Sequence, residues 1–236
     1  MSEPDSTVPS LAGNTFRRAL TSAWYFPLVG IGFSIVYAGI ILAIPTGGAS
    51  ALAEGFPLVG PLYLVFGAGG ALVVFADDRA RGVFEYLIAY GVPPSSLFWN
   101  SVLATVGLAS IVLGISLGIV FGIAAVLGAA LTWPVLELVV FYAIPMTYGG
   151  AVFSVMLGMI WSSLSSPRRG SNSPVGFAPL FGVAPLLVVL FVGELIPHSE
   201  LYLLGSSAGA ILVGTAALVT ALSDLVMVRE RFLSPM

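Results

Sequence analysis

The chain has 236 residues, of which 58% are hydrophobic and only 8% are charged, and its formal net charge is −3. A soluble domain carries roughly 25% charged residues, so water cannot be the only solvent of this chain. It contains no cysteine, which excludes disulfides, thiolate metal sites and cysteine nucleophiles. The small and dispersed net charge also argues against a nucleic-acid partner.

Long uncharged runs of apolar residues indicate the fold class. A run of about 20 such residues is long enough to cross a hydrocarbon core of about 30 Å as a helix. A membrane β-barrel would instead show short alternating strands, and this alternation is absent. We therefore predict an all-α, polytopic integral membrane protein with a single transmembrane domain over residues 21–228. The six predicted spans cover residues 24–44, 57–76, 97–127, 138–164, 175–193 and 201–223.

The segments before and after these spans are short and polar. Residues 1–20 contain prolines and few apolar residues, so we expect a flexible cytoplasmic leader. Residues 229–236 form the expected cytoplasmic tail. Arg17 and Arg18 precede the first span, as they would in a twin-arginine signal peptide. We do not favour that alternative, because further membrane spans follow instead of a soluble cargo.

The arginines decide the expected topology, because basic residues that flank spans are retained in the cytoplasm. They fall before the first span and after the second, fourth and sixth spans, so all lie on one side. They are Arg17, Arg18, Arg79, Arg81, Arg168, Arg169, Arg229 and Arg231. We therefore expect both ends of the chain in the cytoplasm, and the plasma membrane of a prokaryote as its location.

The segment between the second and third spans differs from an ordinary loop. Asp77-Asp78 suits a helix N-terminus, and Arg81 and Glu85 have the i, i+4 spacing of an ion pair. Gly91 followed by Pro93 is a helix stop signal. The apolar strip between these signals consists of Val83, Phe84, Leu87 and Ile88. The pattern predicts a short amphipathic helix along the cytoplasmic membrane surface.

At Arg81 to Leu87, followed by Val92-Pro93, the chain resembles the permease subunits of type-2 ABC transporters, an export-class family with six spans per subunit. Val83 stands where that family often has threonine. In the family this segment is the coupling helix, which rests in a groove of the nucleotide-binding subunit and transmits its closure to the spans. The residues implied for this role are Arg81, Gly82, Val83, Phe84, Glu85, Tyr86, Leu87, Ile88 and Pro93.

The resemblance also implies that transport and ATP hydrolysis are carried out by different subunits of one complex. The chain is expected to be the permease, to pair with a second copy or a paralogue, and to move a substrate across the membrane. A separate P-loop ATPase subunit is expected to bind ATP and Mg. This chain has no lysine for a P-loop, so it is not expected to be an enzyme or to bind a cofactor.

Other chemistry has little support in the sequence. His198 is the only histidine and lies near Glu194 and Glu200, but nothing else converges there, so we expect no metal site. No ionisable residue falls in the middle of a span, which argues against an ion-coupled carrier or channel. An uncharged lining would suit an apolar or amphiphilic substrate.

Small residues recur at every fourth position of the third span, where they allow helix backbones to approach closely. They are Ser110, Gly114, Gly118 and Gly122. This ridge is interpreted as an internal packing face, with a dimer face or a substrate path as the alternatives. Pro145 and Pro185 lie inside spans and are expected to bend them.

A second functional hypothesis remains open. Under this hypothesis the chain is a non-transporting anchor or assembly subunit of another complex, and its amphipathic segment binds membrane lipid instead of an ATPase.

Overall fold

The structure is a computed structural model that describes residues 7–44, 48–164, 184, 186–189, 191–192 and 200–226. Helices are the only regular elements within these residues, and no strand occurs there. Five of the described helical stretches are long and apolar enough to cross a membrane: Tyr25–Ala43, Ala49–Phe75, Ser95–Val126, Trp133–Gly158 and Leu201–Val219. The all-helical, multi-span prediction is confirmed to this extent. The span expected over 175–193 lies mostly outside the described residues.

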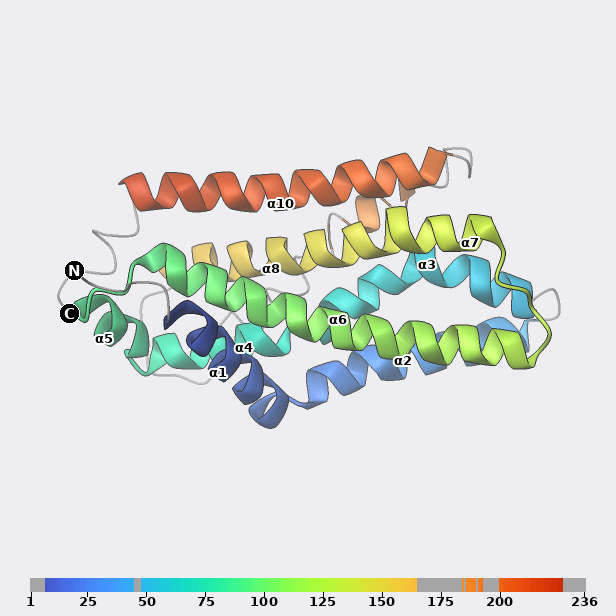
Figure 1. Ribbon diagram of the computed structural model, residues 1–236, viewed down its shortest axis with the longest axis horizontal. Coiled ribbons are helices and arrows are strands. Elements are labelled where there is room, and N and C mark those ends of the chain that lie inside the picture. The colour runs from blue at the N-terminus through green and yellow to red at the C-terminus, as the bar shows by residue number, and fades with distance from the viewer. Residues whose placement is uncertain are drawn as a thin grey trace.

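Five helices run along the long axis of the molecule (Figure 1): α2 (Tyr25–Ala43), α3 (Ala49–Gly67), α6 (Pro94–Val126), α8 (Ile144–Leu164) and α10 (Leu201–Val226). A short helix α7 (Trp133–Leu138) and a π-helix η1 (Val139–Ala143) lead into α8. Three shorter helices gather toward one end: α1 (Thr7–Ser22), α4 (Gly70–Ala80) and α5 (Val83–Ala89). We call the region formed by α1, α5 and the adjoining turns of α4 and α6 the arginine end, because every arginine of the described residues lies there.

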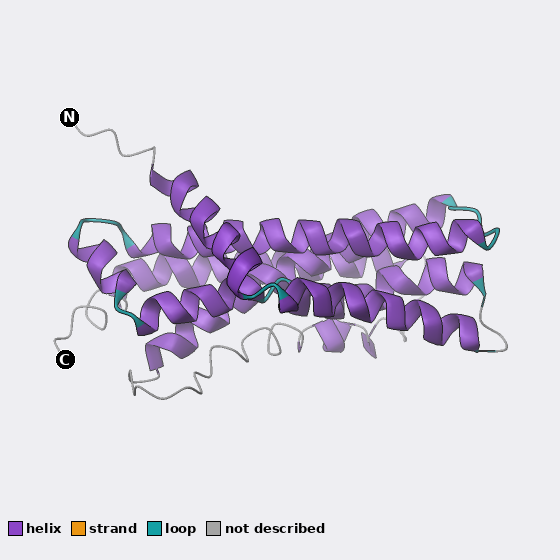
Figure 2. Cartoon of the chain, turned by 90° about the horizontal axis from the view of Figure 1, so that it is seen from below, coloured by secondary structure: helices purple, strands orange, loops and turns teal. Residues whose placement is uncertain are grey.

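The expectation of a flexible leader over residues 1–20 is wrong for most of its length. Residues 7–22 form α1, which lies at an angle to the long helices (Figure 2). Ala12, Phe16, Ala19 and Ala23 are spaced by four, three and four positions, so they lie on one side of the chain. Ala19 and Ala23 are completely buried. This face packs on the bundle, which explains why a polar segment is ordered as a helix.

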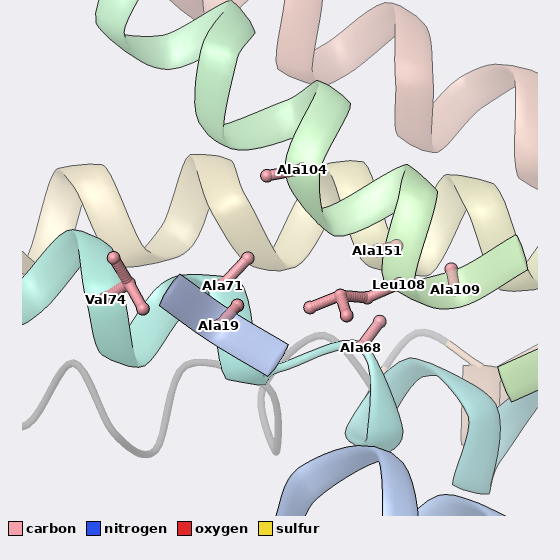
Figure 3. Close-up of a cluster of buried hydrophobic side chains, with 8 residues drawn as sticks. All are labelled: Ala19, Ala68, Ala71, Val74, Ala104, Leu108, Ala109 and Ala151. Atoms are coloured by element: carbon pink, nitrogen blue, oxygen red, sulfur yellow. The ribbon is translucent and has the colours of Figure 1, made fainter. Parts of the chain in front are cut away.

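A cluster of small side chains joins α1 to α4, α6 and α8. Figure 3 shows Ala19 of α1 beside Ala71 of α4, with Leu108 of α6 next to them. Its buried members are Ala19, Ala68, Ala71, Val74, Ala104, Leu108, Ala109 and Ala151. The ring of Phe16 packs beside Gly107, where an added Cβ would lie only 3.1 Å from it. Short side chains therefore let α1 lie close against its neighbours.

The second span begins earlier than predicted. Helix α3 starts at Ala49 and continues through Pro57 and Pro61, so Glu54 lies on an exposed helical face and not in a loop. Prolines are tolerated inside spanning helices because neighbouring groups satisfy the freed backbone. The chain then turns at Ala68-Gly69 before α4 begins. The second span is thus two helices, α3 and α4.

The backbone before Pro145 takes the π form over residues 139–143. In an α-helix the carbonyl of Phe141 would accept a hydrogen bond from the N–H of residue 145, which proline lacks. Ser206 of α10 supplies a donor, because its Oγ lies 2.7 Å from the Phe141 oxygen. The Phe141 carbonyl, which Pro145 leaves without its usual donor, therefore accepts a hydrogen bond from the neighbouring helix α10. Pro185 lies outside the described residues.

The closest helix crossing involves glycines that the sequence analysis did not single out. A Cβ added to Gly209 of α10 would lie 2.6 Å from the Pro145 carbonyl oxygen. A Cβ added to Gly205 would lie equally close, 2.6 Å, to the Tyr142 Cα, and one added to Gly149 would lie 2.9 Å from the Gly209 Cα. Any side chain at these positions would push the two helices apart.

The glycines of the predicted ridge on α6 are in a different environment. An added Cβ at Gly114, Gly118 or Gly122 would meet nothing within 4 Å. Ser110 is also exposed, and its hydroxyl lies 2.8 Å from that of Tyr148 on α8. The described residues therefore do not pack against these glycines, and a packing face, a dimer face and a substrate path all stay predictions.

Gly209→Ala is expected to destabilise the protein by about 1–3 kcal/mol, because the new methyl group overlaps the Pro145 backbone. Gly214→Ala on the same helix is the matched control, since its Cβ meets nothing within 4 Å. Thermal unfolding in detergent measures both. Equal stability of the two variants would contradict the close crossing.

Ser206→Ala is expected to cost about 0.6–1 kcal/mol, because it removes the donor to the Phe141 carbonyl. Ser207→Ala is the control, because Ser207 donates only to Leu204 of its own helix. Denaturant unfolding in mixed micelles compares the two. A larger loss for Ser207→Ala would show that the bond between α10 and η1 is unimportant.

Candidate functional site

Two glycines define the ends of α5. Gly82 has φ 72° and Gly91 has φ 88°, a left-handed conformation that side chains disfavour. At the second end, Gly91 N–H donates to Ile88 O and Val92 N–H donates to Leu87 O, the two bonds of a Schellman motif. The stop predicted from Gly91 and Pro93 is confirmed, and Pro93 then precedes the first turn of α6.

The inner face of α5 is packed into the bundle. Phe84 is only 6% exposed, and its ring centroid lies 4.7 Å from that of Phe75 on α4. Leu97 of α6 completes the buried core of this cluster, and the partly buried side chains around it are Leu87, Ile88 and Val92. Much of the strip interpreted as a membrane or docking face therefore faces the protein. This strip fixes α5 to α4 and α6.

The outer face of α5 presents two tyrosines. Tyr86 is 61% exposed and Tyr90 is 73% exposed, and their ring centroids are 4.5 Å apart. The side-chain hydrogen bond with Tyr90 raises the pKa of Tyr86 above its ordinary value. This face offers aromatic surface with two hydroxyl groups.

The acidic residues lie elsewhere than predicted. Asp77 and Asp78 are in the last turns of α4, and not at the N-terminus of α5. Carboxylates near a helix C-terminus are opposed by the helix dipole, so cationic partners are needed. Arg18 of α1 donates to Asp78 through Nη1 and to Asp77 through Nη2, the latter at 3.3 Å. Arg81 Nε donates to Asp77 Oδ1 at 2.8 Å.

The remaining residues of the predicted coupling segment differ in exposure and in their partners. Arg81 was expected to pair with Glu85 but pairs with Asp77, and its side chain is 70% exposed. The Glu85 side chain lies outside what the structure describes. Val83 is half-buried on the first turn of α5, and Pro93 is exposed. The segment is thus a buried strip with an exposed edge formed by Arg81, Tyr86 and Tyr90.

A cavity of about 480 Å³ lies between α1, α5 and the first turns of α6. Its polar lining includes Arg17, Arg18, Asp78 and Asn100, and its apolar lining includes Leu11, Val83, Phe84, Leu87 and Leu97. Ligand sites in proteins commonly enclose about 300–1,000 Å³, so the volume admits a small molecule. The cavity exists because α1 is ordered against the bundle.

Two of these residues were missed by the sequence analysis. Arg18 was counted only as a topology signal, although the helical spacing from Ala12 to Ala19 places it on a helix. Asn100 was not singled out. It is 3% exposed, and its Nδ2 donates to Ser96 O at 2.7 Å. A polar residue inside an apolar run was the available signal for it.

No group of three or more histidine, cysteine or carboxylate residues that could hold a metal ion occurs within the described residues. His198 and Glu194 lie outside them. Comparison of the chain with protein-family models, with characterised proteins and with solved structures finds no match.

Arg18→Gln is expected to loosen α1 by removing its ion pairs with α4. Hydrogen exchange of α1 amides should accelerate about fivefold, which corresponds to about 1 kcal/mol. Arg17→Gln, compared in delipidated protein, is the control, because Arg17 forms no ion pair within the described residues. Unchanged protection in Arg18→Gln, or an equal loss in both variants, would contradict the role of these pairs. At 1 M salt the difference between the variants should shrink.

Proposed function

We propose that the chain is the permease subunit of an ATP-driven transporter of the type-2 ABC class, and that a separate ATPase subunit docks on α5. The observation that carries this proposal is the division of α5 into two faces. Phe84 fixes the inner face to Phe75 and Leu97, while Tyr86 and Tyr90 remain exposed on the outer face. A partner bound to the outer face moves α5 together with α4 and α6.

The chemistry of the outer face suits a protein partner. Tyrosine and arginine are enriched among the residues that dominate interface energies. Tyr86 and Tyr90 form one exposed aromatic patch, and Arg81 stands beside them at the start of the segment. An aromatic patch held on a fixed helix loses little side-chain freedom when a partner binds.

The arginine end faces the cytoplasm in this proposal, because the positive-inside rule applies to arginines that flank spans. ATP and Mg are then held by the partner subunit, on the same side as α5. Two permease chains, identical or paralogous, complete the complex. Motion passes from α5 across Pro93 into α6, which continues for 33 residues.

The double change Tyr86→Ala and Tyr90→Ala should weaken ATPase binding at least about 30-fold, because each exposed tyrosine is a potential hot spot. Alanine keeps the helix intact. The test is co-purification of a P-loop ATPase with the tagged protein from its native membranes, followed by an affinity measurement. Trp133→Ala is the matched control, since Trp133 is 71% exposed but begins α7, at the opposite end of α6 from α5.

Each outcome has a distinct meaning. Undiminished ATPase recovery with the double variant would disprove docking on the outer face of α5. If no ATPase accompanies well-folded wild-type protein, the anchor or assembly hypothesis replaces the permease. Phe84→Asp is unsuitable for this test, because Phe84 is buried and its replacement disturbs folding.

A further inference from the structure

The cavity between α1, α5 and α6 has a cationic lining. Arg17, Arg18 and Asp78 are its charged residues, two positive and one negative, so their formal sum is +1. Asp78 is already bound by Arg18. Arg17 forms no ion pair within the described residues. A ligand carrying one negative charge would therefore neutralise this lining.

Asn100, which is among the residues that line the cavity, carries an unused hydrogen-bond acceptor. Asn100 is 3% exposed, and its Oδ1 has no partner in the described part of the chain. The other atom of this amide, Nδ2, is already engaged with Ser96 O. A buried polar atom without a partner is costly, so a donor is expected at Oδ1. Hydroxyl and ammonium groups are such donors, and the ionised oxygens of a phosphate are not.

The start of α6, which lines the cavity, fits the depth of the lipid headgroups in a bilayer. Helix α6 is about 50 Å long, whereas a hydrocarbon core is about 30 Å thick, so part of α6 lies outside the core. Trp99 is exposed in the second turn of α6. Tryptophan and tyrosine concentrate at the level of lipid headgroups. Asn100 follows Trp99 directly and therefore lies at about this level.

The apolar part of the lining suits the upper carbons of an acyl chain. Leu11 from α1 and Leu97 from α6 contribute to it, together with Val83 and Leu87 from α5. A free polar ion would leave these side chains facing water. An amphiphile uses both parts of the lining, because its headgroup meets Arg17 and its chain covers the leucines.

We propose that this cavity binds the headgroup of an anionic phospholipid from the adjoining leaflet, with its phosphodiester on Arg17 and a hydroxyl group donating to Asn100 Oδ1. Phosphatidylglycerol is the simplest lipid with this chemistry. Because α1 and α6 both line the cavity, the bound lipid fastens α1 to the bundle. This site goes beyond the proposed function and does not depend on an ATPase.

The experiment uses the purified, delipidated full chain in detergent, titrated with phosphatidylglycerol and separately with phosphatidylcholine. Native mass spectrometry counts the lipids that stay bound. Phosphatidylglycerol should bind at least about tenfold more tightly, because the zwitterionic phosphocholine headgroup has no net charge and no hydrogen-bond donor. Equal binding of the two lipids would overturn the proposal.

Two variants locate the site. Arg17→Gln and Asn100→Leu should each weaken phosphatidylglycerol binding about tenfold. Arg81→Gln is the control for general electrostatic attraction, because Arg81 is exposed at the same end but does not line the cavity. An equal loss in Arg81→Gln would overturn the assignment to this cavity. Arg17 is exposed, so its replacement tests binding even if Asn100→Leu proves unstable.

Thermal unfolding of the lipid-free protein separates binding from folding. Asn100→Leu should change the melting temperature little, because the loss of the hydrogen bond from Nδ2 to Ser96 O is offset by removal of an acceptor that has no partner. A lower affinity with an unchanged melting temperature supports the lipid site, and a lower melting temperature with unchanged affinity contradicts it. Inorganic phosphate is the final probe: displacement of phosphatidylglycerol by millimolar phosphate would show a phosphate site and overturn the lipid.

Discussion

Helices surrounded by lipid gain little from the hydrophobic effect when they associate, because lipid tails are as apolar as leucine. Close contact between helix backbones therefore has to supply the stabilisation that the hydrophobic effect supplies in water. In this protein α2 and α3 meet where an added Cβ at Gly30 would lie 2.9 Å from the Gly67 Cα, and α10 meets α8 at Gly149 and Gly209. Ser206 adds a hydrogen bond across the latter contact. The positions of the long helices follow from these crossings.

The arginine end is held by different forces, because charged side chains gather there. Asp77 and Asp78 lie near the C-terminus of helix α4, where the helix dipole disfavours negative charge. Arg18 and Arg81 compensate this charge by forming ion pairs with the two carboxylates. Arg18 comes from α1, so a segment outside the long helices stabilises the turn into α5. The buried contacts of Phe84 then fix the orientation of α5. The cavity and the exposed tyrosines both result from this arrangement.

The sequence was informative where one kind of residue dominates a whole segment. Apolar runs located the described spans, and Gly91 with Pro93 located the end of α5. It was less informative about which neighbour covers each helix face, because spacing along a helix does not identify the opposing helix. Phe84 was therefore assigned outward, although it is buried against Phe75 and Leu97. Helix α1 was missed because alanine makes its buried face inconspicuous.

The two connections of α5 differ in mechanical character. Toward the C-terminus, α6 is one uninterrupted helix from Pro94 to Val126, whereas toward the N-terminus the chain passes through Gly82, the short helix α4 and the turn at Ala68-Gly69 before it reaches α3. The first path is stiff and the second is compliant. We therefore expect a displacement of α5 to reach the far end of the bundle along α6, while the turn at Ala68-Gly69 limits how far α3 follows.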